Sequence, residues 1–370
     1  MAKAIKYKTF EPNWVVTPGE IISERLEDRN WTQVEFASRL NVSEKHVSQL
    51  VNAHVQINAS LAQKLSNVLG SSPGYWLKLE ALYQADILRA KEAEDLESKK
   101  EWLCTLPLGI LRKRGFIRST LRDVPSCMRE VLQFFAVPDI DTFLVQYNYT
   151  ESQGHQAFRV SQKLKSDPLA LAAWMREGEI AVEAFTGPKY SSAALKDAIT
   201  RLSKMTTLPA ESFDETVTDV LRDAGVAFAV VPAYPKAAVS GVARFINQNL
   251  PLVLLSDYGK SMDKMWFNLF HELGHILLHL TKPKDRKTQV FLDAGSPQAS
   301  DPLEDEANAF ARDTLIPKEH TEALHTLINT EMIEAFAFKI GVHPGIVVGR
   351  MQHEGLAPYR AYSALKVAYG

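Results

Sequence analysis

Hydrophobic and polar positions follow two different periods along this chain. Over residues 18–82, apolar residues recur at helical spacing between short polar turns, which predicts a series of short helices. Two later runs, "GVAFAVVP" over 225–232 and "LPLVLLS" over 250–256, are apolar, β-branched and bounded by turn residues, so they predict strands. A strong helical pattern then begins near Lys260, and more helices follow toward the C-terminus.

The stretch between these regions predicts a helical connection. A charged run, "LRAKEAEDLESKKEW" over 88–102, has the i, i+4 charge pairs of a solvated helix and indicates the first domain boundary. Beyond it the pattern stays helical but is broken by prolines. We therefore expect a multi-domain protein with an all-α domain over 1–87, a helical connecting region over 88–206 and an α+β domain over 207–370.

Composition narrows the class of protein. The 370 residues are 46% hydrophobic and 23% charged with a formal net charge of -2, so any contact with nucleic acid must be local. The two cysteines, Cys104 and Cys127, cannot form a disulfide framework and suit a reducing cytosol. The first residues lack an apolar signal region, and no window approaches 18 uninterrupted apolar residues. These features predict a cytoplasmic protein that does not enter a membrane.

The stretch "HELGHILLH" carries candidate metal chemistry. His271 and His275 lie four residues apart, so on a helix both imidazoles project from the same face and can share one metal. Neutral imidazole suits Zn²⁺, and a catalytic zinc site needs three protein ligands and an open position for water. Glu272, between the histidines, is then the candidate general base that accepts a proton from the attacking water.

The third ligand is left open by the spacing alone. A helix expected over 302–317 offers Glu304 and Glu306, with Asp305 between them. His279 competes with them, but three ligands at i, i+4 and i+8 would span ~12 Å along one helix, too far for one ion. A carboxylate is therefore favoured. Imidazole-rich ligation favours zinc over manganese.

An oxyanion stabiliser is not identified by the sequence. Tyr258, His320 and His343 could each donate a hydrogen bond to a developing oxyanion, but such residues are more often structural, and none is preferred. Asn308, two residues past Glu306, is expected to make a local structural hydrogen bond.

The stretch "WTQVEFASRLNVSEKHVSQLVNA" has the pattern of a helix-turn-helix. Thr32 and Ser43 are expected N-caps of two helices whose apolar faces pack together across the turn "NVS". Polar residues of the second helix then point outward, where Gln can pair with adenine and Lys with guanine or phosphate. The candidate DNA-contacting residues are Thr32, Gln33, Ser43, Lys45, His46, Ser48, Gln49 and Asn52. The alternative is a helical bundle for protein contact, since residues 1–80 carry 9 Lys/Arg against 8 Asp/Glu.

The zinc motif is part of a longer resemblance. "FNLFHELGHILLH" followed by "EDEANAFARDTLIP" resembles the ImmA/IrrE-type metallopeptidases. The resemblance implies a zincin-like fold, His271, His275 and Glu306 as zinc ligands, Glu272 as general base, and a sheet edge that takes an extended peptide. The sequence departs from the family at "FNLFHE" and "RDTLIP", which touch no proposed ligand but leave the fit to substrate open.

The N-terminal region also resembles a known family. Its "TPGE" opening, "VSEKHVSQL" element and "WLKL" close are similar to the HigA-type antitoxins among the XRE-type helix-turn-helix repressors. This resemblance implies homodimers bound to palindromic operator DNA. The central stretch "VLQFFAVPDID" resembles the linker of longer helix-turn-helix and peptidase fusions, which names no function.

Together these patterns predict a transcriptional regulator that carries a zinc endopeptidase. Its substrate would be a repressor-like protein, either a separate partner or another copy of this chain. A second hypothesis is a HigA-like antitoxin or repressor, with a toxin partner, whose zincin domain binds metal or a ligand without proteolysis. A third is a metallopeptidase independent of DNA whose helical domain docks its substrate.

Overall fold

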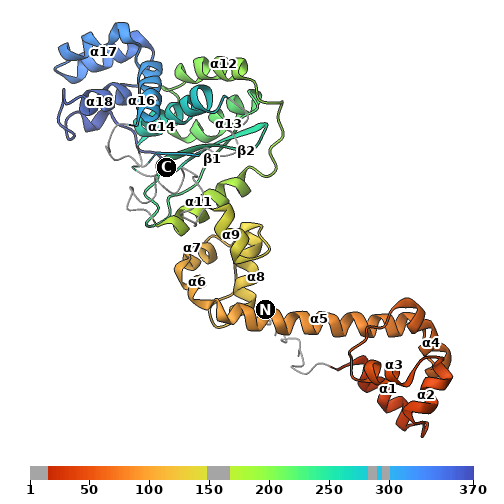
Figure 1. The fold of residues 1–370 in the computed structure, drawn as a ribbon. Helices are drawn as coiled ribbons and strands as arrows, with labels where there is room; N and C mark the ends of the chain where they lie inside the picture. Colours follow the sequence, from red (N-terminus) through yellow and green to blue (C-terminus); the bar gives the residue numbers. More distant parts are fainter. Residues whose placement is uncertain (1–15, 148–166, 258, 260, 282–289, 294–300) are drawn as a thin grey trace, which may run out of the picture. The chain divides into compact units, whose positions relative to one another are not determined.

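The computed structural model describes residues 16–147, 167–257, 259, 261–281, 290–293 and 301–370. Contacts divide the chain into two compact units, Met1–Trp102 with Thr120–Met128, and Leu103–Ser119 with Arg129–Gly370. Figure 1 shows the elements of each unit.

Short capped helices build the N-terminal unit. Thr17, Thr32, Ser43 and Asn58 each accept a backbone hydrogen bond at a helix start, and the first two form reciprocal capping boxes. The helices are α1 (Pro18–Glu27), α2 (Gln33–Leu40), α3 (Glu44–Val51), α4 (Ala59–Leu69) and α5 (Pro73–Ser98). Their shared core includes fully buried Ile22, Phe36, Val47, Leu65 and Trp76. The predicted helix-turn-helix domain is therefore confirmed.

Further helices follow within the predicted connecting region, residues 88–206. They are α6 (Lys100–Thr105), α7 (Leu108–Lys113), α8 (Val124–Phe135), α9 (Ile140–Gln146), α11 (Pro168–Ala181) and α12 (Ser192–Ser203). The last two pack with the C-terminal elements: the Trp174 indole donates to the Val231 carbonyl at 3.0 Å, and Leu195 lies in the C-terminal core. The packing of α11 and α12 thus joins them to the sheet that follows.

A small mixed sheet organises the C-terminal region. Within the described residues it has four strands in the order β1-β3-β2-β4, with β1 parallel to β3 and the other pairs antiparallel. The strands are β1 (Ala227–Val230), β2 (Gly241–Asn247), β3 (Leu250–Leu255) and β4 (Phe291–Asp293). The two runs predicted as strands form β1 and β3, and the α+β class is confirmed. No pattern in the sequence had indicated β4.

Helices pack on this sheet and on one another, and two of them, α14 and α16, carry the candidate site. They are η1 (Ala210–Ser212), α13 (Phe213–Asp223), α14 (Met262–Gly274), α16 (Pro302–Leu315), α17 (Thr330–Ile340) and α18 (Pro344–His353), with short 3₁₀ turns at Lys318–His320, Glu322–Thr326 and Ser363–Leu365. α14 continues into a π-helical turn, η2 (His275–His279), and packs against α16, β2 and β3 (Figure 1). The described residues contain no single helix that is long and apolar enough to cross a membrane; α17 and α18, bent by 111°, meet that composition only when joined.

Candidate metal centre and DNA-binding surface

Two histidines of α14 and its π-helical extension meet on the buried side of the helix. Their Nε2 atoms lie 3.0 Å apart, and His271 and His275 are 1% and 0% exposed. The helix is fixed here because neighbouring residues such as Trp266, Leu269 and Phe270 lie in the C-terminal core. The i, i+4 spacing predicted from the sequence therefore places both imidazoles at one point.

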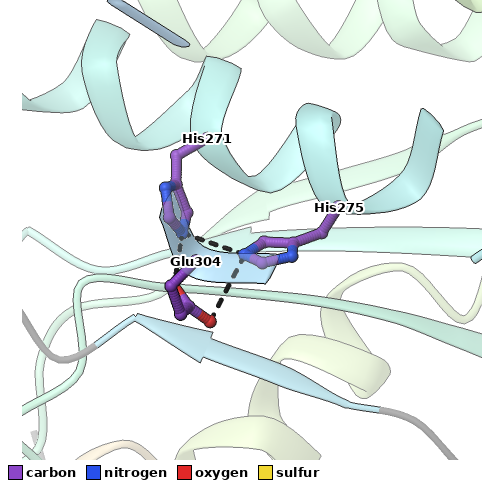
Figure 2. A group of neighbouring side chains, drawn as sticks. All are labelled: His271, His275 and Glu304. Carbon is purple, nitrogen blue, oxygen red and sulfur yellow. Dashed lines mark hydrogen bonds and ion pairs between the residues drawn. The ribbon is translucent and has the colours of Figure 1, made fainter. Parts of the chain in front are cut away.

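A carboxylate from α16 completes the cluster. Glu304 places one oxygen 3.2 Å from His271 Nε2 and the other 3.6 Å from His275 Nε2. Figure 2 shows the three side chains pointing toward one another, and their donor atoms all lie within 4.8 Å. Two imidazoles and one carboxylate converging in this way fit the donor set of a catalytic zinc site.

Glu306, the carboxylate preferred as ligand from the family pattern, occupies a different position. Its Oε2 lies 3.1 Å from Nε2 of His279, and its side chain is 63% exposed. Residues two apart on an α-helix point roughly half a turn away from each other, so Glu304 and Glu306 cannot face the same pair of histidines. The structure brings Glu304 to that pair, the alternative that spacing alone had left open.

The electrostatics of the cluster suit a cation. Burial lowers the pKa of His275 to about 4, so its ring is neutral and has a lone pair to offer near neutral pH. Burial opposes ionisation of Glu304, but the contacts of its carboxylate with the imidazoles of His271 and His275 outweigh it and lower the pKa of that carboxyl to about 2. The cluster therefore combines neutral imidazole with a negative carboxylate.

Glu272, the candidate general base, is fully buried beside the cluster. It lies against the backbone of β2 at Gly241, where an added Cβ would come 2.5 Å from Glu272 Oε1. Gly241 pairs with Leu255 on one side and with Asp293 of β4 on the other. The Glu272 carboxylate thus lies between α14 and the sheet. A side chain larger than that of glycine at position 241 would collide with it.

Two contacts around the histidines were missed by sequence reasoning. Asn308 was expected to bond locally, but its Oδ1 lies 3.1 Å from His271 Nδ1, 37 residues away. Asn308 is four residues past Glu304 and so shares its helix face, a relation that would have indicated this contact had Glu304 been chosen. His279 Nδ1 lies 2.9 Å from His275 Nδ1.

The three residues considered as oxyanion stabilisers lie in different surroundings. Tyr258 lies outside the described residues. His320 belongs to a 3₁₀ turn, with its ring near that of Phe336. His343 caps α18, because its Nδ1 accepts a hydrogen bond from the Gly345 amide at 3.0 Å, and burial lowers its pKa. It also lines a cavity of about 300 Å³ with Trp266.

The candidate DNA-contacting residues lie on and around α2 and α3. Val47 and Leu50 of α3 are buried, and the polar residues between them are turned outward. Gln33, Lys45, Ser48 and Asn52 are exposed, and His46 and Gln49 are half-buried. The hydroxyls of Thr32 and Ser43 cap α2 and α3. The buried Val47 and Leu50 agree with the predicted inner face of this helix, while His46 and Gln49, which were expected to point outward, are half-buried.

Comparisons with known proteins match both ends of the chain. A helix-turn-helix family model matches residues 22–76, and the IrrE N-terminal-like domain of a peptidase family matches residues 229–347. An uncharacterized HTH-type transcriptional regulator of Escherichia coli, YddM, is 38% identical over 63 residues, which are 17% of this chain and 67% of that protein.

Two solved structures also match part of the chain. One is a candidate antidote protein of a plasmid maintenance system from Nostoc punctiforme, 27% identical with a TM-score of 0.22. The other is an addiction module antidote protein of a HigA family from Coxiella burnetii, 26% identical with a TM-score of 0.21. Each match covers 23% of this chain and 92% of the other.

Proposed function

Because the chain belongs to the HTH-type transcriptional regulators and carries an IrrE N-terminal-like peptidase domain, we propose that it is a DNA-binding regulator with a zinc-dependent endopeptidase centre. The observation that carries the proposal is the convergence of His271, His275 and Glu304 beside a buried Glu272. A purely structural zinc site is usually closed by a fourth protein ligand and has no need of an adjacent base.

The residues of the cluster have distinct roles in this proposal. His271, His275 and Glu304 would hold Zn²⁺, which supplies Lewis-acid chemistry that activates water and polarises a peptide carbonyl. Glu272 accepts the proton of the attacking water and then donates it to the leaving amine. Its place against Gly241 of β2 keeps the carboxylate beside the histidines through both transfers.

DNA binding is assigned to the outer face of α3. Lys45 and Gln49 offer an ammonium group and an amide, the side-chain groups that read guanine and adenine in the major groove. We expect a homodimer on a palindromic operator, because two copies of a domain with weak local charge gain affinity by binding together.

The substrate we propose is a repressor-like protein. A peptidase tethered to operator DNA meets other proteins bound at the same site at high effective concentration. Another copy of this chain satisfies the same condition. The chemistry requires only an accessible peptide bond in an extended segment.

The test compares wild type with Glu272→Gln in cells that lack the native gene. Both proteins should contain one zinc per chain by mass spectrometry, and new protein N-termini should accumulate only with the wild type. Identical N-termini from both proteins would contradict the role of Glu272. If wild type and Glu272→Gln regulate target genes equally and neither produces new N-termini, the protein would be a repressor whose metal centre binds metal or a ligand without proteolysis.

A further inference from the structure

A chain of side chains leads from His275 out to the protein surface. His275 Nδ1 lies 2.9 Å from His279 Nδ1, and His279 Nε2 lies 3.1 Å from the Glu306 carboxylate. On the other histidine, His271 Nδ1 lies 3.1 Å from Asn308 Oδ1. Each histidine of the cluster thus uses Nε2 toward Glu304 and Nδ1 toward a second partner.

The backbone is shaped for the first of these contacts. After Gly274 the α-helix widens into the π-helical turn η2, closed by the Leu280 amide bonding to the His275 carbonyl at 3.0 Å. Turns of this kind are rare and occur mostly at functional sites. Here the turn contains both His275 and His279, and the His279 side chain is only 4% exposed.

An aromatic ring holds the same pair in place. Phe291 of β4 stacks on His275 with ring centroids 4.1 Å apart and planes 17° apart, and it also meets His279 at 5.4 Å. Stacking fixes the plane of the His275 ring, so its Nδ1 is directed at His279 rather than free to turn.

With neutral rings and a cation between the two Nε2 atoms and Glu304, the outer hydrogen bonds of the cluster have one consistent assignment of donors and acceptors. The Glu306 carboxylate can only accept, so His279 Nε2 carries the proton and, in the neutral ring, His279 Nδ1 accepts. His275 Nδ1 must then donate, which leaves the lone pair of His275 on Nε2. In the same way, an accepting Asn308 Oδ1 leaves the lone pair of His271 on Nε2.

We propose that Glu306 and His279 act as a relay of positioning residues that sets the tautomer of His275, and that Asn308 does the same for His271. Glu306 does not itself bind the metal in this proposal. It affects metal binding through the rings of His279 and His275. The inference rests on the proposed metal site at His271, His275 and Glu304. Removal of such an outer partner typically lowers metal affinity by about 10- to 100-fold.

The test measures the zinc dissociation constant of the full-length protein by chelator competition. Glu306→Ala and His279→Ala should each bind zinc about 10- to 100-fold more weakly. Glu306→Gln, which keeps an acceptor, should lie between wild type and Glu306→Ala. The double variant should be no weaker than the worse single variant, because both residues act in one chain of bonds.

Matched controls separate the relay from charge and from ligation. Asp305→Asn removes the same charge from the same helical turn at an exposed position and should leave the affinity unchanged. Glu304→Ala should lose stoichiometric zinc. With Co²⁺ in place of Zn²⁺, Glu306→Ala should keep the visible spectrum of the wild type, since the ligand set is unchanged, while Glu304→Ala should alter it.

The outcomes distinguish this inference from the proposed function. Wild-type affinity in Glu306→Ala, or loss of stoichiometric zinc there but not in Glu304→Ala, would overturn the relay. If the variants show the expected zinc affinities but the wild type cleaves no protein, the peptidase activity would be contradicted and the role of Glu306 and His279 would still hold. A wild type that binds no zinc would overturn both. Circular dichroism of the metal-free variants verifies that each is folded.

Discussion

Gly241 decides how closely the sheet can approach the proposed general base. A Cβ at this position would lie 2.5 Å from Oε1 and 2.9 Å from Cγ of Glu272. Since Glu272 is fully buried, its side chain has no solvent-filled space into which it could withdraw. The size of one residue on a neighbouring strand therefore controls the position of the proposed catalytic carboxylate.

Gly241→Ala should destabilise the protein by about 1–3 kcal/mol, the usual cost of overpacking, and should displace Glu272 enough to reduce cleavage strongly. Zinc content should stay at wild-type level, since no ligand is touched. Thermal unfolding and the N-terminus assay measure the two effects. Gly109→Ala is the control, because a Cβ there meets no atom within 4 Å. Equal unfolding temperatures for Gly241→Ala and Gly109→Ala would show that the contact has no energetic weight.

The side chains proposed as metal ligands should make the metal-free protein sensitive to acid. His275 is protonated near pH 6.5 when unfolded and only near about 4 when folded, so the unfolded state binds more protons in that window. Stability should therefore fall as pH drops from about 6.5 to about 4, by about 3 kcal/mol from this group. Glu304, ionised down to about pH 2 in the fold against 4.5 normally, adds a loss below pH 4.5.

Urea unfolding of the chelated protein from pH 8 to pH 4 measures this dependence. His275→Gln removes the titrating group, so its unfolding free energy should change less between pH 6.5 and pH 4. A wild type with the same slope as His275→Gln would contradict the assignment.

Helix caps fix the elements of the N-terminal unit. Thr32 accepts a hydrogen bond from the Glu35 amide, and the Glu35 carboxylate accepts one from the Thr32 amide. The backbone and side-chain hydrogen bonds from Thr32 also lower the pKa of Glu35. Thr32 was named as a candidate DNA contact, and its hydroxyl is engaged in holding the start of α2.

Thr32→Ala should destabilise the N-terminal unit by about 1 kcal/mol, the typical value of an N-cap. Ser38→Ala, an exposed change within the same helix, should alter stability by less than about 0.5 kcal/mol. Chemical denaturation followed by circular dichroism measures both. Equal midpoints for the two variants would show that the cap contributes nothing.

At the scale of the whole molecule, the candidate DNA-binding surface and the candidate metal centre lie in two different compact units. Lys45→Ala and Gln49→Ala should each weaken operator binding by about 1–3 kcal/mol while zinc content and cleavage stay unchanged. Lys78→Ala, an exposed charge on α5, is the control. Fluorescence anisotropy at several salt concentrations separates the two roles, since loss of a phosphate contact lowers the salt dependence and loss of a base contact does not. Equal operator affinity of all three variants would show that Lys45 and Gln49 of α3 do not contact the DNA.

Local patterns determined most of the architecture. N-caps at Thr32 and Ser43, apolar runs at β1 and β3, and the four-residue spacing of His271 and His275 each act within one turn or one strand, so sequence alone was sufficient to predict them. The buried and exposed faces of α3 follow from the same helical period.

Only the tertiary structure decided the relations between distant segments. Whether Glu304 or Glu306 faces the histidines depends on the rotation of α16 against α14, which a spacing of two residues cannot fix. The pairing of β4 with β2 and the contact of Asn308 with His271 likewise arise where separate elements pack. The sequence therefore determined the local elements and the HExxH motif. Packing between elements selected the third carboxylate and the contacts of Asn308 and Glu306 with histidines, because these contacts join residues 27 to 37 positions apart in the chain.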